Sequence, residues 1–260
     1  MPEPIYKLIS TVPAYQLNWS LSLFWKEYPV PEAGWLGPLK GSVEKDGVRI
    51  LEHSAKDNRS QFLLSTTPGT APDKLAWSVK GRLQNIMRRE RPKAFSRKYA
   101  YRSVGTANRE RIENYIEHQL GHHRMADPRV QARQAKYQRE YPEVDLSEPR
   151  CSAHGRYWYN LHLAVVTDHR YIELRDDVLT LWGDTVEKTA RKHGHLLSRM
   201  GVLPEHLHVL LGCRQEEAPD RVALAYMNNL AYVSGRKPIF KSNFYVGTVG
   251  EYNLRSVRGS

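Results

Sequence analysis

The feature of this sequence that most restricts its fold is an internal repeat with a period of about 145 residues. Several short segments recur in the same order, at offsets between 144 and 147 residues. The matching pairs are residues 15–19 with 159–163, 71–73 with 218–220, and Phe95 followed by 103–105 with Phe240 followed by 248–250. A sustained period indicates a duplicated structural unit, and small loop insertions explain the drift in offset.

The pattern inside each repeat predicts the order of its elements. Alternating apolar residues predict strands at 15–25, 48–52, 61–65 and 204–211. Apolar residues at helical spacing predict a helix at 75–86, after a capping residue at 71–73, and further helices at 107–120 and 178–193, whereas residues 29–47 receive no assignment. We therefore predict an α+β protein made of two ferredoxin-like (RRM-like) repeats, each an antiparallel sheet with helices on one face.

The repeat also divides the chain. Residues 1–124 form the first half and residues 151–260 the second. Residues 125–150 are polar and charged and contain three prolines, which indicates a connector with one exposed helix. With 260 residues, the chain is long enough for a large hydrophobic core in either one or two domains.

The composition indicates a polyanionic partner. Lysine and arginine number 39 against 28 aspartate and glutamate residues, giving a net charge of +11 and a pI near 9.6. This excess favours nucleic acid over membrane, with a solubilising surface charge as the alternative. Two cysteines, Cys151 and Cys213, fit a reducing compartment, and the sequence shows no membrane-spanning run or signal-peptide layout. We therefore expect a cytoplasmic protein with no membrane partner.

Cations and aromatic side chains alternate in the stretch from residue 80 to residue 102. This mixture suits contact with a phosphate backbone whose bases stack on the neighbouring rings, although charged runs of this kind are also common on solvated loops. The cations that we expect to bind DNA are Lys80, Arg82, Arg88, Arg89, Arg91, Arg97 and Lys98.

Two histidines lie two positions apart on the expected strand at 204–211. Side chains at such positions leave the same face of a strand, so His206 and His208 form half of a divalent-metal site. The alternative is a pair of histidines whose hydrogen bonds are satisfied within the fold. At the corresponding positions of the first half, at an offset of 147, the sequence has Arg59 and Gln61, so only the second half retains the histidine pair.

The first half contributes a different pair. Tyr115 and Gln119 are four residues apart on the expected helix at 107–120 and therefore share one face. The carbonyl oxygen of Gln119 could complete a site of two histidines and one oxygen for a hard or borderline cation. A tyrosine on an amphipathic helix is otherwise a core residue with its hydroxyl at the rim. The position corresponding to Tyr115 in the second half is Ser260.

These motifs resemble the single-tyrosine HUH transposases, which include insertion-sequence transposases and their REP-associated relatives. The family pattern is His-apolar-His on a central strand, a Phe-to-Val-Gly stretch, and a helix with tyrosine and glutamine four residues apart. Residues 204–211, 240–250 and 115–119 match these three elements.

The resemblance implies a metal-dependent enzyme that nicks and joins single-stranded DNA near a hairpin. His206, His208 and Gln119 would hold Mg²⁺ or Mn²⁺, and Tyr115 would form a 5′-phosphotyrosine intermediate. Family members are typically dimers in which the tyrosine helix of one subunit can complete the histidine site of the other. We expect this chain to be a fused pseudo-dimer with one such composite site, and the reciprocal site at Arg59 and Gln61 to be inactive.

Two other functions remain compatible with the sequence. A domesticated, catalytically weak relative would bind hairpin or single-stranded DNA as a regulator. A replication initiator would use the same chemistry, but no helicase-like segment follows in this sequence. Tyr115, Gln119, His206 and His208 together favour the enzyme, because a DNA-binding regulator needs only the basic surface.

Overall fold

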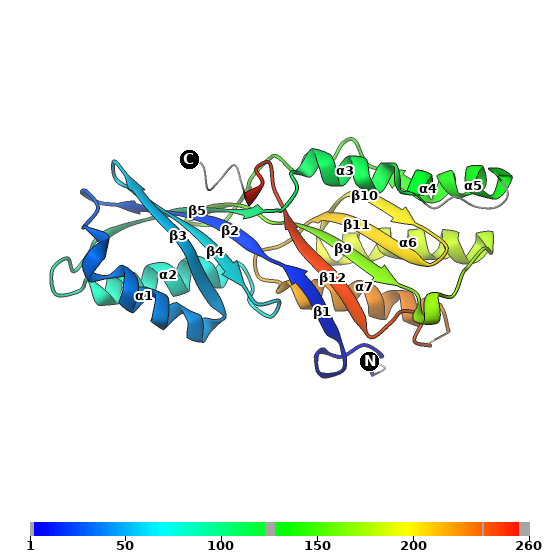
Figure 1. Ribbon diagram of the computed structural model, residues 1–260, viewed down its shortest axis with the longest axis horizontal. Coiled ribbons are helices and arrows are strands. Elements are labelled where there is room, and N and C mark those ends of the chain that lie inside the picture. The colour runs from blue at the N-terminus through cyan, green and yellow to red at the C-terminus, as the bar shows by residue number, and fades with distance from the viewer. Residues whose placement is uncertain (1–2, 123–127, 236, 255–260) are drawn as a thin grey trace.

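The computed structural model describes residues 3–122, 128–235 and 237–254 and contains two six-stranded sheets that lie side by side (Figure 1). The first sheet has the order β3 (Val48–Lys56), β4 (Arg59–Thr66), β2 (Asn18–Trp25), β5 (Phe95–Val104), β8 (Gly155–Trp158) and β7 (Arg150–Cys151). The second has the order β1 (Val12–Gln16), β12 (Asn243–Val249), β9 (Asn160–Val166), β11 (His206–Gly212), β10 (Leu196–Val202) and β6 (Gln138–Glu140).

Seven α-helices accompany the two sheets in the described residues. They are α1 (Leu36–Val43), α2 (Asp73–Ile86), α3 (Arg109–Glu117), α4 (Gln119–His122), α5 (Pro128–Gln134), α6 (Asp176–His193) and α7 (Pro219–Val233). Short 3-10 segments lie at Leu8–Ser10, Glu32–Gly34, Glu44–Asp46, Ala135–Tyr137 and Asp168–Arg170. No helix in the described ranges is long and apolar enough to cross a membrane.

Four consecutive strands of each sheet are antiparallel and follow one pattern: β3-β4-β2-β5 in the first sheet and β12-β9-β11-β10 in the second. Along the chain, β2, α1, β3, β4, α2 and β5 build the first sheet, and β9, α6, β10, β11, α7 and β12 repeat that order in the second. The expectation of purely antiparallel sheets is wrong, because β8 joins β5 and β1 joins β12 in parallel. Both sheets are therefore mixed.

The two parallel strands are exchanged between the sheets. Strand β1 precedes the first four-stranded unit but pairs with β12 in the second sheet, whereas β8 precedes the second unit but pairs with β5 in the first. The registers correspond, since Gln16 lies opposite Gly247 and Trp158 lies opposite Arg102. Each sheet thus takes its added parallel strand from the segment that precedes the other unit.

Hydrogen bonds along the seam between the sheets come in matching pairs. The Ser103 hydroxyl donates to the carbonyl of Val249, and the Thr248 hydroxyl donates to the carbonyl of Val104 at 2.7 Å. One isolated bridge joins Gly105 to Asn253, and another joins Asn108 to Gly250. The second bridge repeats the first with the roles of the two halves exchanged. A third pair consists of backbone bonds: the amide of Asp220 donates to the carbonyl of Pro68 at 3.1 Å, and the amide of Asp73 donates to the carbonyl of Gln215 at 3.0 Å.

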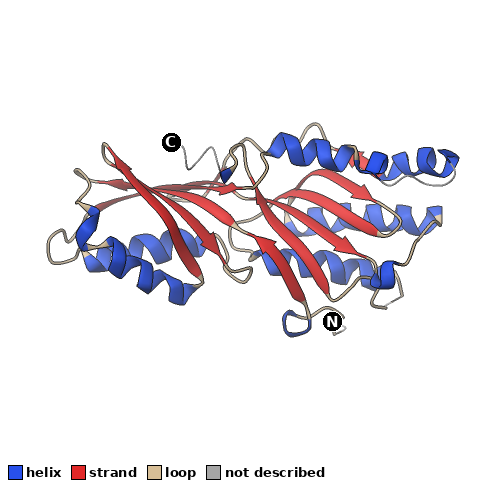
Figure 2. Ribbon diagram, in the orientation of Figure 1, coloured by secondary structure: helices blue, strands red, loops and turns tan. Residues whose placement is uncertain are grey.

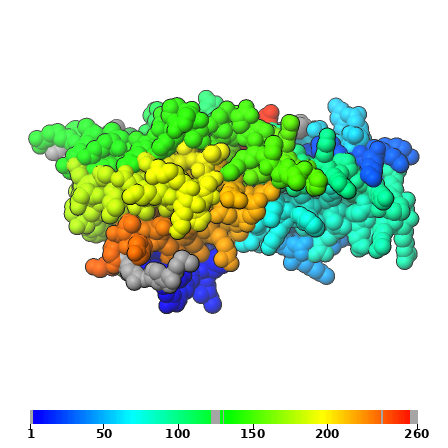
Figure 3. Space-filling view, turned by 180° about the vertical axis from the view of Figure 1, so that it is seen from behind, coloured from blue at the N-terminus to red at the C-terminus, as the bar shows by residue number. Residues whose placement is uncertain are grey.

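One hydrophobic core runs through both units. Core side chains point from each sheet toward its helices. In the first sheet they include Leu21, Phe62 and Tyr101, and in the second Leu163, Val209 and Val246. At the seam the indole of Trp19 lies 5.2 Å from the Tyr159 ring, measured between centroids. Viewed from behind, the two units form one continuous elongated body (Figure 3).

The helices do not all lie on one side of the sheets, so that expectation also fails. Helices α1 and α2 cover one face of the first sheet, and α6 and α7 cover one face of the second (Figure 2). Helices α3 to α5 run along the other side of the second sheet (Figure 2), where Ile116 of α3 packs against Leu210 and Val249.

Local differences from the expected elements have identifiable causes. Residues 29–47, which received no assignment, contain α1, a short helix whose two glycines and one proline obscure its pattern. The strand expected at 15–25 is divided at Leu17, because the segment before it turns away to the second sheet. The helix expected at 107–120 ends at Glu117 and resumes at Gln119. The expected connector contains α5, and also the short strand β6.

The offset assigned to the first strand also needs correction. The amide of Thr66 donates to the carbonyl of Leu17 at 3.0 Å, and the amide of Cys213 donates to that of Tyr159 at 2.7 Å. Leu17 therefore corresponds to Tyr159, an offset of 142 residues instead of 144. Ser260, the expected counterpart of Tyr115, lies outside the described residues.

Candidate functional site

The site lies on the face of the second sheet that is turned away from α6 and α7. Leu207 and Val209 of β11 point to the apolar core, so His206 and His208 point to the opposite side. Both histidines are buried, which follows from the position of β11 between β9 and β10 and from the helices above it. The expected common orientation of the two imidazoles is present, and their ring centroids lie 5.0 Å apart at nearly right angles.

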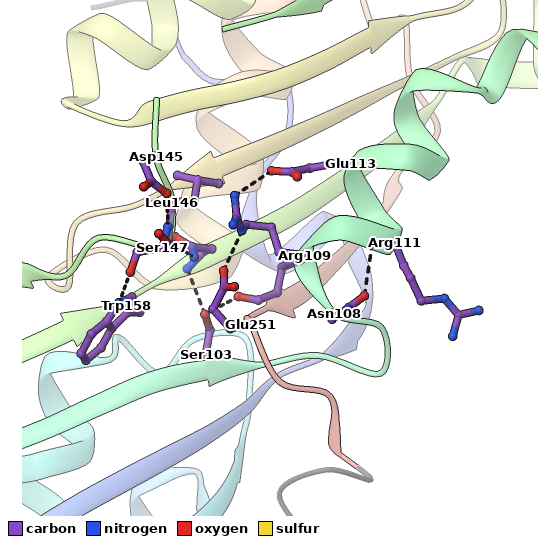
Figure 4. Close-up of polar contacts among 12 residues, drawn as sticks. Ser103, Asn108, Arg109, Arg111, Glu113, Asp145, Leu146, Ser147, Trp158 and Glu251 are labelled. Carbon is purple, nitrogen blue, oxygen red and sulfur yellow. Dashed lines mark hydrogen bonds and ion pairs between the residues drawn. The ribbon is translucent and has the colours of Figure 1, made fainter. Parts of the chain in front are cut away.

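Helix α3 carries Tyr115 above this face and is fixed at its N-terminus. The side chain of Asn108 caps the helix by accepting from the amide of Arg111 at 3.2 Å. Arg109 pairs with Glu251 at 2.6 Å and with Glu113 at 3.3 Å (Figure 4), so the helix is tied to residues that follow β12. Ile116 provides the apolar anchor beneath it.

Residues from distant parts of the chain meet at this point. The Oε1 atom of Gln119 lies 3.0 Å from Nε2 of His206, and Gln119 is almost completely buried. The ring of Tyr115 lies 5.5 Å from that of His208, edge to face, and 45% of the Tyr115 residue remains exposed. The fold therefore places a solvent-accessible tyrosine beside two buried histidines and a buried amide.

A third histidine, which the sequence left unassigned, belongs to the same group. Nε2 of His162 on β9 lies 2.9 Å from Nδ1 of His208, and the two rings are stacked. Burial lowers the pKa of His162 to about 4, so this imidazole is neutral at physiological pH. In the sequence, the alternation Leu-His-Leu at 161–163 indicates that His162 lies on the polar face of its strand. In the fold, this strand lies next to β11, which brings His162 to the site.

The separation between the donor atoms of Gln119 and His206 is compatible with a shared divalent cation. Neighbouring ligands at right angles around an ion with bonds of about 2.1 Å are separated by about 3 Å, and Gln119 Oε1 and His206 Nε2 are 3.0 Å apart. If Nδ1–H of His208 donates to His162, the ligating lone pair of His208 is on Nε2. A neighbouring hydrogen bond of this kind commonly orients a metal-binding imidazole.

Another group of potential ligands lies where α6 ends and β10 begins. His193, His195 and Glu217 place their donor atoms within 4.8 Å of one another. Glu217 bonds to both imidazoles, at 3.0 Å and 2.7 Å, and the second nitrogen of His195 bonds to the hydroxyl of Tyr226. Although burial acts to raise it, these imidazoles hold the pKa of Glu217 below its ordinary value. Mutual hydrogen bonding accounts for this cluster, and Tyr115 is not part of it.

The equivalent face of the first sheet has a different character. Arg59 and Gln61 on β4 occupy the positions that His206 and His208 occupy on β11. The strand registers agree, because Gln61 lies opposite Ser22 of β2 and His208 lies opposite Ala164 of the equivalent strand β9. The Gln61 side chain donates to the hydroxyl of Ser20 at 3.0 Å. Neither position supplies an imidazole.

The expected DNA-binding cations lie at one end of the molecule, around α2 and β5. Lys80 donates to the carbonyl of Arg97 at 3.1 Å, and both residues line a cavity of about 460 Å³ beside Trp77, which is 80% exposed. The exposed cations of this set are Arg88, Arg89, Arg97 and Lys98.

Two other members of that set are already engaged. Arg82 forms a two-pronged ion pair with Asp46, with distances of 2.7 and 2.6 Å. Arg91 donates to the carbonyl of Tyr28 at 2.6 Å and lies over its ring. Their guanidinium groups are less available for a new anion than those of the exposed arginines.

Comparison with known proteins gives a family for part of the chain. Residues 38–119 match the family model described as "Transposase IS200 like". This region contains Tyr115 and Gln119, whereas His206 and His208 lie outside it. No curated protein matches the sequence significantly.

Solved structures of transposases are among the matches. A REP-associated tyrosine transposase bound to a REP hairpin matches with 17% identity and a TM-score of 0.32 over 39% of this chain; the match spans 61% of that protein's chain. A protein of Deinococcus radiodurans R1 described as a transposase matches with 23% identity and a TM-score of 0.34, over 42% of this chain and 94% of the other. The family match confirms the resemblance for one part of the chain: residues 38–119 are similar to the IS200-like transposases.

Proposed function

We propose that this protein cleaves and rejoins single-stranded DNA at a site flanked by a hairpin, with Tyr115 as the nucleophile. The observation that carries the proposal is the convergence of Tyr115 and Gln119 on the second-sheet histidines. Gln119 lies within hydrogen-bonding distance of His206, and Tyr115 packs edge-on against His208. A binding surface alone has no need of a tyrosine held against imidazoles in this way.

The reaction conserves the phosphodiester energy. The Tyr115 oxygen attacks the scissile phosphorus, the bond to the 3′ oxygen breaks, and the downstream strand becomes attached through a 5′-phosphotyrosine bond. The tyrosine proton passes to solvent, and the departing 3′ oxygen takes up a proton. Attack by a second 3′-hydroxyl reverses the step, so strands are rejoined without ATP.

His206, His208 and Gln119 are the residues that would hold Mg²⁺ or Mn²⁺. Bound there, the cation would supply Lewis-acid polarisation of the scissile phosphate and compensate the charge that develops on it. The protein supports this role by burying the three ligands and by orienting the His208 ring through His162.

We also propose that the chain is an internal dimer of two ferredoxin-like units with a single active site. Three observations support this reading: the repeated element order, the exchanged parallel strands and the matched hydrogen bonds at the seam. In a two-fold interface each contact occurs twice, with the roles of the two units exchanged. The functional halves would be residues 1–124 and 151–260, joined by residues 125–150. In this reading Arg59 and Gln61 mark an inactive copy of the site.

The DNA would extend across the basic end of the first unit. Arg88, Arg89, Arg97 and Lys98 are exposed there, and Lys80 and Trp77 line the adjacent cavity. Cations would hold the phosphates and the exposed indole would stack on an unpaired base or a hairpin tip. Arg82 and Arg91 would contribute less, because each already has a partner.

The test is a covalent-adduct assay on a library of single-stranded hairpins labelled at the 5′ or the 3′ end. With Mn²⁺ present, we expect a denaturant-resistant adduct that retains the 3′ label, together with a released 5′-labelled fragment. Tyr115→Phe and His208→Ala should abolish it, whereas Tyr171→Phe and His169→Asn, which alter exposed residues outside the site, should not. Tight hairpin binding without an adduct, across the library and with both metals, would leave only a DNA-binding regulator.

A further inference from the structure

The first sheet has a groove on the face that α1 and α2 do not cover. The groove has a volume of about 420 Å³, and its walls include Ser20, Arg59, Gln61, Arg102, Trp158 and Tyr252. The strand registers place these side chains of β2, β4, β5 and β8 on one face, opposite the core residues Leu21, Phe62 and Tyr101. We call this surface the basic groove.

The charge of the basic groove is positive. Arg59 and Arg102 line it, and the registers place Lys56, opposite Arg59, and Arg156, opposite Ala100, on the same face. Among the described residues, none of these four cations forms an ion pair with a carboxylate. The acidic residue Glu52 also lies on this face, but on the outer strand β3, where it is opposite Leu63. The groove therefore offers guanidinium groups to an external anion.

Aromatic rings frame one of these cations. The guanidinium carbon of Arg102 lies 4.3 Å from the centre of the Trp158 ring and 5.7 Å from that of Tyr252. The indole N–H of Trp158 donates to the carbonyl of Ser147 at 2.6 Å (Figure 4), so its ring is held in place before any ligand arrives. Tyr252 is about half exposed. Such rings offer flat surfaces for stacking, and the adjacent arginine offers phosphate contacts.

We propose that the basic groove binds a single-stranded stretch of nucleic acid, with bases stacked on Trp158 and Tyr252 and phosphates paired with Arg59 and Arg102. Stacking rings and unpaired cations in one groove match this ligand class, because every base has a π-face and every nucleotide a negative charge. The inference goes beyond the proposed nicking reaction and uses none of its residues. The first unit would hold the strand where the second unit has its histidines.

The test measures binding of a fluorescent oligothymidylate of 12 nucleotides to the full chain carrying Tyr115→Phe, so that no cleavage occurs. In that background, Trp158→Ala and Arg59→Ala should each weaken binding about tenfold, and Trp158→Phe should largely restore it. The matched control is Arg221→Ala, an exposed arginine on α7. An abasic strand of the same length should bind the parent protein about as weakly as the normal strand binds Trp158→Ala.

Three results would overturn the proposal. If Trp158→Ala, Arg59→Ala and Arg102→Ala all bind the oligonucleotide as the Arg221→Ala control does, the groove is not the site. Equal affinity for abasic and normal strands would remove the stacking role. Loss of binding in His208→Ala together with unchanged binding in the groove variants would assign all affinity to the catalytic face. Adduct formation on hairpins, measured separately with Tyr115 intact, reports on the nicking reaction alone.

Discussion

Replacing Ser103 by alanine should destabilise the whole chain, because this hydroxyl joins the two halves at their seam. It donates to the carbonyl of Val249 and accepts from the backbone amide of Asn160 at 3.2 Å, and both groups belong to the second half. Ser103 is 1% exposed, so water cannot replace the lost partner. Thr248 makes the matching pair of bonds, to the carbonyl of Val104 and from the amide of Asn18 at 2.9 Å.

The size of the effect follows from the two orphaned groups. A buried polar group that loses its partner costs about 1–3 kcal/mol, so the substitution should lower the free energy of unfolding by about 2–4 kcal/mol. For a chain of this size, that corresponds to a fall in melting temperature of about 4–8 °C. Thr248→Ala should cost at least as much, since it also removes a buried methyl group.

Urea unfolding followed by circular dichroism would measure both changes. Ser103→Thr, which installs the residue present at the equivalent position of the other half, should stay close to the parent protein. Ser54→Ala, at an exposed position of β3, is the control for an alanine in a strand. A change of less than about 0.5 kcal/mol for Ser103→Ala would refute the argument, because it lies within the range of ordinary surface substitutions.

Three further predictions concern other parts of the fold. His162→Gln should weaken Mn²⁺ binding about 10-fold or more in calorimetry, because the ring that orients His208 is lost, and unchanged affinity would contradict that role. Hydrogen bonds from Arg82 and Ser78 lower the pKa of Asp46 to about 2, below its unfolded value, so its stabilisation should be complete above about pH 4 and decline toward pH 2. After discounting for exposure, Asp46→Asn should cost roughly 1 kcal/mol at pH 6 and progressively less in urea titrations down to pH 3; a pH-independent difference would show that the ion pair is not its cause. Gly250→Ala would place a Cβ atom only 2.1 Å from the carbonyl oxygen of Ser103 and should lower stability by at least about 2 kcal/mol, whereas Gly41→Ala meets no atom within 4 Å and should be neutral or stabilising in the same assay.

The sequence predicts those parts of the fold in which side-chain pattern and structure share a period. The apolar stripe from Leu75 to Ile86, after a cap at 71–73, predicts helix α2 (Asp73–Ile86), and the alternation at 204–211 correctly places both histidines on one face of β11. The internal repeat predicts a recurring order of elements, and the same order of strands and helices builds both sheets. These features depend on local periodicity, which one sequence is sufficient to show.

Other features depend on information that local pattern does not contain. Strand β1 is mostly exposed, so its residues carry no signal for which sheet it joins, and the exchange with β8 was not predictable. Helix α1 contains residues of poor helix propensity and forms because Leu39 and Val43 are buried against the first sheet. His162 was overlooked because its role depends on β9 lying next to β11, a pairing between residues 40 to 52 positions apart in the sequence.

The pairing of β1 with β12 has a consequence for how this protein is made. Val12 lies opposite Asn243, so β1 leaves the ribosome long before its partner strand β12 is synthesised. At about 5–20 residues per second, β1 must wait roughly 10–50 s for its partner. Throughout that interval its backbone donors and acceptors can pair with the edge of another nascent chain. Synthesis on polysomes therefore exposes this protein to intermolecular strand exchange, and slow translation should increase the fraction of linked dimers.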